Sequence, residues 1–263
     1  MKILFIGDII GEPGRKTVKE LLPQIIQENQ IEFTIANGEN LAGGKGITDT
    51  VAQEIFDSGV EAITLGNHTW ERKEVEKIIN DNRIIRPANF PSGVPGKGWG
   101  IFSINNEVKI CVINLIGRVY MQLADCPFRT VDGILEIINK ITNKIIVDFH
   151  SEITSEKQAM GWYLNTKVSA VIGTHTHVQT ADERILPPGK TAYISDCGMV
   201  GPCNGVIGMD REIIIKKYLT GLPIKFNVAK GQCIFNACII DIDKTTGNAI
   251  KITRITNTNV KQY

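Results

Sequence analysis

Residues 1–40 read MKILFIGDII GEPGRKTVKE LLPQIIQENQ IEFTIANGEN, and this stretch decides the fold. Residues 2–6 are a short apolar run that predicts a buried strand, and residues 32–36 predict a second one. Between them, from about residue 15 to residue 29, apolar side chains recur at the spacing of one helix face. The stretch therefore predicts a β-α-β unit in which both strands lead into polar residues beside glycine.

The same alternation continues along the chain. Residues 51–57 and 71–80 predict two more helices, and residues 61–65 predict a third strand. Further strands are predicted at residues 101–104, 108–115, 145–149, 170–172 and 191–194, and a β-hairpin at residues 232–243 and 249–255, around Thr245-Thr246-Gly247-Asn248. Alternating strands and helices followed by strand-rich sequence are typical of a layered α/β domain. We expect one domain over residues 1–263.

Composition excludes several classes of protein. The 29 basic and 28 acidic side chains give a net charge of +1, which argues against a nucleic-acid coat or a membrane-surface protein. The sequence contains neither the ~7–15 apolar residues of a secretory signal nor the ~20 of a spanning helix, so we expect no membrane association. The six scattered cysteines form no CxxC pair and indicate reduced thiols in the cytoplasm.

Polar side chains follow five of the predicted strands, at the point where each strand ends. These clusters are Gly7-Asp8, Asn37-Gly38-Glu39-Asn40, Gly66-Asn67-His68, His150, and Gly173-Thr174-His175-Thr176-His177. Ligands of open α/β sheets bind in the crevice beyond the carboxyl ends of the strands. All four histidines of the chain lie in these clusters, which is difficult to explain by packing alone.

Imidazole, carboxylate and amide groups are the ligands that ions such as Zn²⁺, Mn²⁺ or Fe use in proteins. His175 and His177 are two residues apart, so they project from the same side if the strand geometry continues. The clusters hold more such groups than one ion requires, and two ions that share a bridging carboxylate would use them fully. The sequence therefore predicts a metal site and favours two ions over one. Two ions form a clamp for displacement at phosphorus.

His68 has two possible roles beside this site. Asn67 can bind a metal through its amide oxygen while His68 points toward a leaving group, to which it would donate a proton as general acid. The alternative is that His68 is a further metal ligand.

The order of the clusters resembles that of the calcineurin-like metallophosphoesterases. That family has a strand-end aspartate, a bridging acid, Gly-Asn-His, an isolated histidine and Gly-His-x-His, which match Asp8, Glu39, Asn67-His68, His150 and His175-Thr176-His177. The chain departs from the pattern at three places. Ile10 replaces a usual histidine, Glu39-Asn40 replaces a bridging aspartate, and Thr69 replaces an acid that orients the catalytic histidine in many relatives.

With these departures, the sequence resembles one branch of the family, the bacterial YmdB-like phosphodiesterases. The blocks GDIIGEPGR, IANGEN, KGIT, GNHTW, RPANFP, DFHSEITSEK, GTHTHVQTAD and GMDR, between residues 7 and 211, are similar to its signatures. The resemblance implies a four-layer α/β/β/α sandwich. It also implies that one metal is held by Asp8, Glu39, Asn40 and His177, that the other is held by Glu39, Asn67, His150 and His175, and that His68 is the general acid.

The resemblance further implies the activity of a 2′,3′-cyclic-nucleotide 2′-phosphodiesterase. Hydroxide held by two divalent or mixed-valence ions, iron or manganese, would attack the phosphorus, and His68 would protonate the ribose oxygen that leaves. The implied substrate is a cyclic nucleotide or an RNA-derived phosphodiester, and the implied assembly is a homo-oligomer, either a dimer or a tetramer.

Other functions and several loop roles stay open at this point. The same metals would suit a phosphomonoesterase or a phosphoprotein phosphatase, and a regulatory protein could keep them to sense a nucleotide. Lys45, in a glycine-rich loop that matches no P-loop, has either a substrate-binding role or none. Residues 86–100 predict a loop beside the site that could act as a lid, and residues 117–132 predict a second lid or an oligomer contact.

Overall fold

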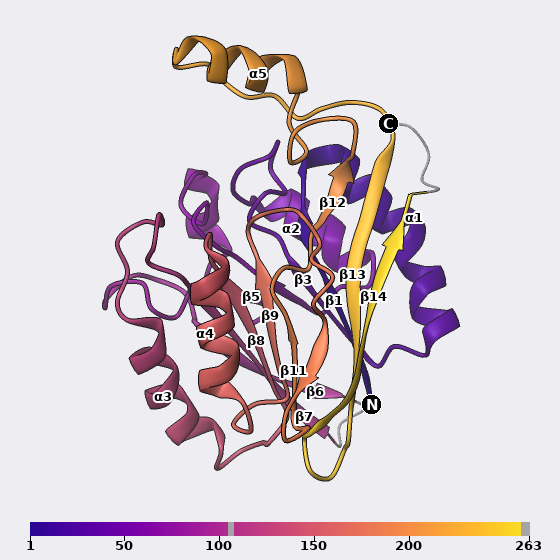
Figure 1. The fold of residues 1–263 in the computed structure, drawn as a ribbon, viewed down its shortest axis with the longest axis vertical. Helices are drawn as coiled ribbons and strands as arrows, with labels where there is room; N and C mark the ends of the chain where they lie inside the picture. The colour runs from indigo at the N-terminus through magenta and orange to yellow at the C-terminus, as the bar shows by residue number, and fades with distance from the viewer. Residues whose placement is uncertain (105–107, 259–263) are drawn as a thin grey trace.

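The computed structural model describes residues 1–104 and 108–258 and consists of two β-sheets packed face to face with helices on their outer sides (Figure 1). The first sheet has the strand order β2-β12-β13-β1-β3-β4-β5, and β14 pairs with β13. The second sheet has the order β10-β11-β9-β8-β7-β6. Strands from the beginning and the end of the chain are therefore neighbours, because β13 pairs with β1.

The first sheet comprises β1 (Lys2–Ile6), β2 (Asp8–Ile9), β3 (Phe33–Asn37), β4 (Ala62–Thr64), β5 (Ile84–Ile85), β12 (Met199–Pro202), β13 (Cys233–Ile242) and β14 (Ala249–Asn257). The second sheet comprises β6 (Trp99–Ile104), β7 (Val108–Ile116), β8 (Ile145–His150), β9 (Ala170–Thr174), β10 (Arg184–Leu186) and β11 (Thr191–Ile194). The α-helices in the described part of the chain are α1 (Gly11–Asn29), α2 (Asp49–Asp57), α3 (Pro127–Ile138), α4 (Thr154–Leu164) and α5 (Arg211–Thr220).

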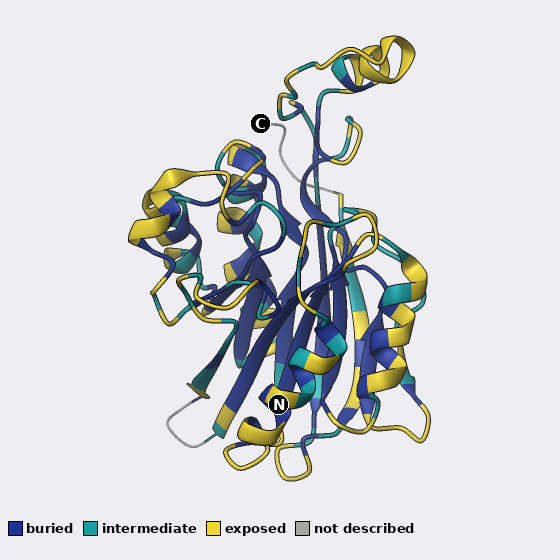
Figure 2. Cartoon of the chain, turned by 90° about the vertical axis from the view of Figure 1, so that its left-hand side faces the viewer, coloured by how far each residue is buried: buried dark blue, intermediate teal, exposed yellow. Residues whose placement is uncertain are grey.

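Three apolar layers separate the four layers of secondary structure. In β1, Ile3 and Phe5 face the space between the sheets, whereas Leu4 and Ile6 join the core beneath α1 and α2. A third core packs α3 and α4 against the second sheet. Most strands are consequently buried on both faces, and most exposed residues lie on the helices and in the loops (Figure 2), whereas β14 at the side of the first sheet is partly exposed. The predicted four-layer α/β/β/α sandwich is confirmed.

The parallel strands bring their carboxyl ends to one edge of the sandwich. β1, β3, β4 and β5 run parallel in the first sheet, and β7, β8, β9 and β11 run parallel in the second. Near this edge, Asp148 of β8 points into the layer between the sheets, because it lies on the same face of the strand as Ile146. Asp148 accepts hydrogen bonds from Asn37 Nδ2 (3.1 Å) and Thr64 Oγ1 (2.5 Å) of the first sheet and from Thr174 Oγ1 (2.7 Å) of the second. Polar contacts therefore fix the two sheets relative to each other at this edge.

The helix predicted at residues 71–80 is wrong. This segment contains only one 3₁₀ turn, Lys73–Lys77. The residue before the turn is Arg72, which supplies no side-chain acceptor for the first N–H groups, and its guanidinium instead donates to the carbonyl oxygens of Ala42 and Lys45. The turn therefore ties the chain to the loop of residues 42–46 instead of extending as a helix.

Parts of the two possible lid segments, residues 86–100 and 117–132, form a strand and a helix. Residues 99 and 100 belong to β6, and the remainder of 86–100 is folded around Arg86, whose guanidinium donates to the carbonyl oxygens of Pro87, Val94, Pro95 and Gly96. Residues 127–132 begin α3, which the sequence pattern did not reveal, and α4 and α5 were not predicted either. The predicted hairpin is confirmed by the pairing of β13 with β14. No helix among the described residues is both long and apolar enough to cross a membrane.

A close backbone approach in the second sheet can be tested at Gly173 of β9. A Cβ atom at this position would lie 1.8 Å from the carbonyl oxygen of Ser195, so Gly173→Ala must displace backbone. We expect the free energy of unfolding in urea to fall by about 2 kcal/mol or more. The matched control is Gly133→Ala in α3, where nothing lies within 4 Å and a helical alanine should stabilise by about 0.5–1 kcal/mol. Equal effects at the two positions would contradict this account.

Candidate metal centre

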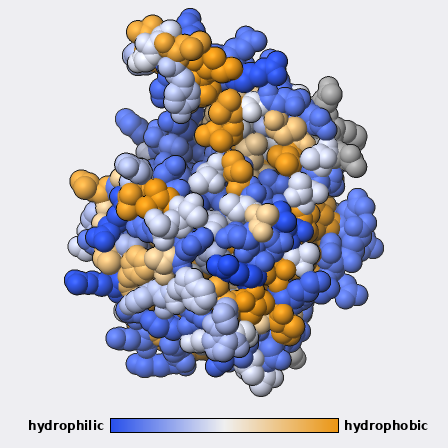
Figure 3. Space-filling view, in the orientation of Figure 1, coloured by the Kyte–Doolittle hydropathy of each residue, from blue (hydrophilic) through white to orange (hydrophobic). Residues whose placement is uncertain are grey.

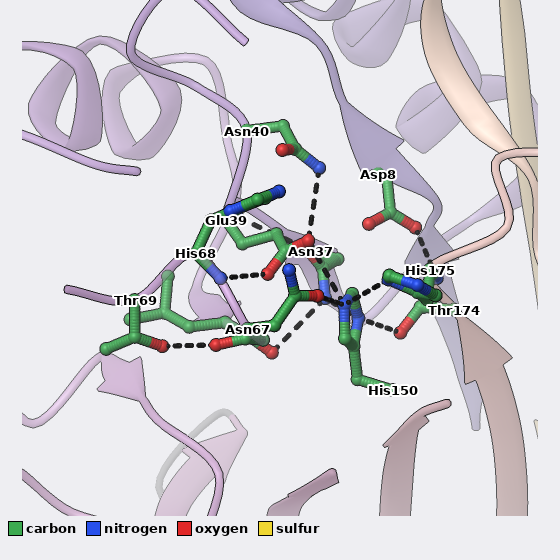
Figure 4. Close-up of polar contacts among 12 residues, drawn as sticks. Asp8, Asn37, Glu39, Asn40, Asn67, His68, Thr69, His150, Thr174 and His175 are labelled. Carbon is green, nitrogen blue, oxygen red and sulfur yellow. Dashed lines mark hydrogen bonds and ion pairs between the residues drawn. The ribbon is translucent and has the colours of Figure 1, made fainter. Parts of the chain in front are cut away.

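The strand-end residues of both sheets meet at the edge described above (Figure 4). Asp8 begins β2, whereas Glu39 and Asn40 follow β3, and Asn67 and His68 follow β4. The second sheet contributes His150 at the end of β8, and His175 and His177 after β9. Direct contacts link all seven predicted metal ligands and His68 into one group.

Three ligand-type atoms surround Nε2 of His150, which is completely buried. They are Glu39 Oε1 at 3.1 Å, Asn67 Oδ1 at 3.0 Å and His175 Nδ1 at 3.0 Å. The opposite ring nitrogen of His150 contacts Thr174 Oγ1 at 2.9 Å. One imidazole N–H cannot satisfy three acceptors at once, whereas a cation between these four atoms would bind them all. Glu39, His150 and His175 each offer one ligand atom, and these three atoms all lie within 4.8 Å of one another.

A second group of ligand-type atoms adjoins the first. Nε2 of His177 lies 3.8 Å from Asp8 Oδ1 and 3.3 Å from the amide nitrogen of Asn40. That amide also contacts Glu39 Oε1 at 3.3 Å, so the same oxygen of Glu39 borders both groups. Asp8 Oδ1 is buried and accepts no hydrogen bond from the described residues, which is costly unless a cation is bound.

Gly66 leaves room at the centre of the site. A Cβ atom at this position would lie 2.3 Å from Glu39 Oε2 and 2.4 Å from His150 Nε2. Any other residue would therefore push against the two side chains that border the first group. Together with the unpartnered oxygen of Asp8 and the nitrogen and oxygen donors, this space fits a bound metal.

The charges of the site also depend on close contact. Burial opposes ionisation of Glu39, but the charge and hydrogen bond of His150 lower the pKa of Glu39 to about 2. Burial likewise opposes protonation of His150, yet Glu39, Asp8 and Asp148 raise the pKa of His150 to about 9. Burial raises the pKa of Asp8 to about 7, and burial beside His150 lowers the pKa of His175 to about 3. The negative charge of Glu39 and a proton on His150 therefore stabilise each other.

The turn that carries His175 and His177 does not continue the strand. β9 ends at Thr174, and His175 and His177 have φ angles of 101° and 64°, so the strand geometry on which their expected direction depended does not continue. Both side chains still reach the site, because the main-chain nitrogen of His175 donates to Asp8 Oδ2 (3.1 Å) and Nδ1 of His177 contacts the carbonyl oxygen of Ile207 (2.9 Å).

A buried ion pair supports this turn from beneath. Lys157 of α4 donates to Asp196 Oδ2 (2.6 Å) and to the carbonyl oxygen of Thr174 (2.8 Å). Asp196 also accepts hydrogen bonds from the main-chain nitrogens of Thr176 (3.1 Å) and Gly198 (2.8 Å). Since the carbonyl of Gly198 in turn binds the nitrogen of Asp8, the ion pair positions both histidines relative to Asp8.

His68 is joined to the centre by its backbone. Its main-chain nitrogen donates to Glu39 Oε2 (2.9 Å), and its Nδ1 lies 3.4 Å from Glu71 Oε1. Thr69 instead donates its hydroxyl hydrogen to the carbonyl oxygen of Gly66 (2.6 Å). Glu71 therefore supplies the acid beside the histidine that Thr69 lacks. Burial and the charge of Lys45 lower the pKa of His68, partly offset by Glu39 and Glu71.

Several residues of the site were missed in the sequence analysis. Glu152 contacts His175 Nε2 at 2.9 Å, and Asp148, Glu71, Lys157 and Asp196 act as described above. The spacing of two residues between Asp148 and His150 in β8 was a usable signal, because alternate residues of a strand share a face, whereas Glu152 lies beyond the end of this strand. Lys157 and Asp196 act through tertiary contacts that no local pattern indicates.

Two basic side chains, Lys45 and Arg15, lie outside the central group. The Lys45 side chain is exposed, and its influence on His68 places it near the site. Arg15 forms a short ion pair with Glu54 (Nε–Oε2 2.7 Å) and donates to the carbonyl oxygen of Leu41, so it has a structural role.

The chain is similar to known proteins in sequence and in fold. A family model described as YmdB-like protein matches residues 4–255. A Bacillus subtilis protein named 2′,3′-cyclic-nucleotide 2′-phosphodiesterase is 51% identical, with 97% of this chain and 96% of that protein covered. Crystal structures of a hypothetical protein from Thermus thermophilus and of a Mycoplasma pneumoniae protein described as a novel phosphatase both match with a TM-score of 0.91. Their identities are 38% and 35%, and the matches cover 97% and 100% of this chain and 98% and 94% of theirs.

The pKa values of the site predict how metal binding depends on pH. His150, with its pKa raised to about 9, must lose its proton before Nε2 can bind a cation, and Asp8, at about 7, must ionise. The affinity of the site for a metal ion should therefore rise with pH up to about 9. Binding of the ion should release about one proton near pH 8, from His150, and up to two protons below about pH 7, where Asp8 is also protonated. Calorimetric titration of Mn²⁺ in buffers of different ionisation enthalpy measures this number. Binding near pH 8 without proton release would contradict the raised pKa of His150.

Proposed function

The chain belongs to the YmdB-like family, and we propose that it is a metal-dependent phosphodiesterase that hydrolyses 2′,3′-cyclic nucleotides to 3′-nucleotides. The observation that carries this proposal is the convergence of Glu39, Asn67 and His175 on Nε2 of His150, at the point where the strands of both sheets end. The relative from Bacillus subtilis, named for this activity, supports the choice of substrate.

We assign the two groups of ligand-type atoms to two metal ions. Asp8, Glu39, Asn40 and His177 would hold one ion, and Glu39, Asn67, His150 and His175 would hold the other. Oxygen and imidazole ligands suit iron or manganese. Bound there, such ions neutralise charge on the phosphate and acidify a water. Asn40 now presents its amide nitrogen to Glu39 and His177, and a half-turn about its terminal bond would present the oxygen that a cation requires.

His68 is the proposed proton donor to the departing 2′ oxygen. The contact of its Nδ1 with Glu71 leaves Nε2 to face the substrate, and the bond from its backbone to Glu39 keeps the ring beside the centre. Burial lowers the pKa of the free imidazole, and the negative charge of a bound phosphodiester acts in the opposite direction. Water gives up a proton to solvent and adds its oxygen to phosphorus, the bond from phosphorus to O2′ breaks, and O2′ receives the proton of His68, which solvent then restores.

A phosphomonoesterase is the second candidate, because one of the matching structures is described as a phosphatase. Both reactions need the same phosphate site, so the metal centre alone does not choose between them. The two differ in the leaving group. A monoesterase would cleave a simple aryl phosphate faster than a cyclic diester.

We also propose that the chain forms a homo-oligomer, a dimer or a tetramer, through α5. This helix extends away from the body of the molecule (Figure 1), and apolar side chains gather on the projecting segment (Figure 3). Tyr218 is 84% exposed and Leu219 is 81% exposed, with Ile215 and Leu222 also more than half exposed. Covering such a surface with a second copy removes apolar area from water.

The cytoplasm is the proposed location. All six cysteines are free thiols, and Cys197 and Cys238 remain thiols although their Sγ atoms lie 3.9 Å apart between the sheets. A reducing compartment keeps such thiols unpaired.

The proposed reaction can be tested with 2′,3′-cyclic AMP and manganese-loaded protein. We expect the parent chain to form 3′-AMP. Glu39→Gln should lose both metal and turnover, because it removes the charge that borders both groups of ligands. His68→Ala should keep the metals and lose about 10²–10⁴-fold in kcat, the usual contribution of a general acid. Product analysis by chromatography and metal analysis of each variant measure these effects.

Controls separate the roles in this experiment. His150→Ala serves as the variant that loses metal through a ligand. Metal loss in His68→Ala equal to that in His150→Ala would refute the proton-donor role. Faster cleavage of an aryl phosphate than of the cyclic diester would favour the phosphomonoesterase, and nucleotide binding by metal-loaded protein without turnover would indicate a regulatory protein.

The assembly can be tested by replacing Tyr218 and Leu219 with serine. Light scattering after gel filtration should show a lower mass than for the parent chain, because the variant loses the apolar surface of α5. The matched control replaces Tyr120 and Leu123, which are 87% and 94% exposed in the segment predicted as an alternative oligomer contact. Dissociation of the control and not of the α5 variant would move the contact to that segment.

A further inference from the structure

A groove with several basic side chains lies beside the loop of residues 42–46. It is bounded by the first turn of α1, by this loop and by residues 225–230, and its volume is about 640 Å³. Its charged and aromatic lining residues are Glu12, Lys16, Arg72, Lys225, Phe226 and Lys230, and we call it the basic groove. Four cations thus face one carboxylate, and that carboxylate is already paired with Lys16 (Oε1–Nζ 2.8 Å).

The cations of the basic groove are not all paired, and Asp210 and Glu212 lie near one of them, Lys230, in the lining of an adjoining pocket. Within residues 1–104 and 108–258, no carboxylate forms an ion pair with Arg72, Lys225 or Lys230. The guanidinium of Arg72 is fixed by the carbonyl oxygens of Ala42 (2.6 Å) and Lys45 (3.1 Å), which keeps its charge in place. A further cation, Lys217, lies 4.6 Å from the centre of the Phe226 ring. These positive charges are therefore already in place for an anionic ligand.

Backbone contacts connect the wall of the basic groove to residues of the metal centre. The carbonyl oxygen of Asn40 accepts hydrogen bonds from Gly11 (2.9 Å) and Gly44 (3.2 Å), next to Glu12 and Gly43 in the groove wall. The side chain of the same Asn40 contacts Glu39 and His177 at the centre. Arg72 stands four residues after His68. The walls of the groove are therefore built on the residues that border the catalytic histidine and the bridging carboxylate.

We propose that the basic groove binds the phosphates of an oligoribonucleotide whose 3′ end carries the 2′,3′-cyclic phosphate. This inference rests on the proposed function and specifies its substrate class as RNA ends. A cyclic mononucleotide has a single phosphate, which the metal centre occupies, so it leaves the groove without a ligand. An RNA chain carries another phosphate on the 5′ side of each nucleotide. Cations interleaved with an aromatic ring are typical of sites that bind single strands.

The test compares 2′,3′-cyclic AMP with a tetranucleotide that ends in a 2′,3′-cyclic phosphate. For the manganese-loaded parent chain, kcat/KM should be about tenfold or more higher on the tetranucleotide, and this advantage should fall as salt rises. The double variant Lys225→Ala and Lys230→Ala should lose the advantage through a higher KM. Its kcat/KM on 2′,3′-cyclic AMP should be unchanged, because neither lysine belongs to the metal centre.

The matched control is the double variant Lys140→Ala and Lys190→Ala. It removes the same charge from exposed positions after α3 and before β11, on the other sheet, and it should behave as the parent chain. For the tetranucleotide, the slope of log KM against the logarithm of the salt concentration should decrease by about 1.4 in the groove variant, because two phosphate contacts are lost. The slope should not change in the control. Equal effects of the two variants would overturn the proposal.

The outcomes distinguish the groove from the proposed activity. Hydrolysis of 2′,3′-cyclic AMP without any advantage for the tetranucleotide would overturn the role of the groove and leave the phosphodiesterase intact. If neither substrate is hydrolysed, the proposed activity is refuted, and the role of the groove is then tested separately by measuring how tightly the tetranucleotide binds. In that case, a fluorescent tetranucleotide should bind the parent chain at least about tenfold more tightly than the groove variant, and equal binding would overturn the proposal.

Discussion

The carboxylate of Asp148 is the point on which the geometry of the site depends. It lies between the sheets and accepts hydrogen bonds from Asn37 and Thr64 on one side and from Thr174 on the other. Apolar packing alone is not directional and would allow the sheets to shift. Because ligands come from both sheets, such a shift would change the distances between them. Burial raises the pKa of Asp148, against the opposing effects of His150 and of these hydrogen bonds.

A second constraint acts on the turn after β9, where the chain leaves the regular strand. The left-handed φ angles of His175 and His177 are unfavourable for residues other than glycine, and they persist because neighbouring groups hold the turn. Lys157 and Asp196 bind its backbone from beneath, and Asp8 and Ile207 bind it from the sides. The edge that carries the candidate site is thus fixed by buried charges as well as by the sheets.

Much of this arrangement could be predicted because it follows from local sequence patterns. The apolar runs indicated the strands, and the polar residues after them included every proposed ligand, since parallel strands end at a common edge. The helix at residues 71–80 was wrong because Arg72 binds a distant loop, which periodicity does not show. Glu71, Glu152 and Asp196 were missed for a similar reason, because each acts on a histidine or its turn through the folded structure.

The position of β13 has a consequence for the order in which the molecule forms. This strand is close to the end of the chain, yet it lies between β12 and β1 in the middle of the first sheet. During synthesis, Asp8 and Glu39 emerge early, but the strand that supports β1 on one side arrives only after residue 232. Sequence-distant pairings of this kind are slow to form. A fragment that ends before residue 233 therefore lacks one neighbour of β1, so we expect the residues of the candidate site to take their final positions late in synthesis.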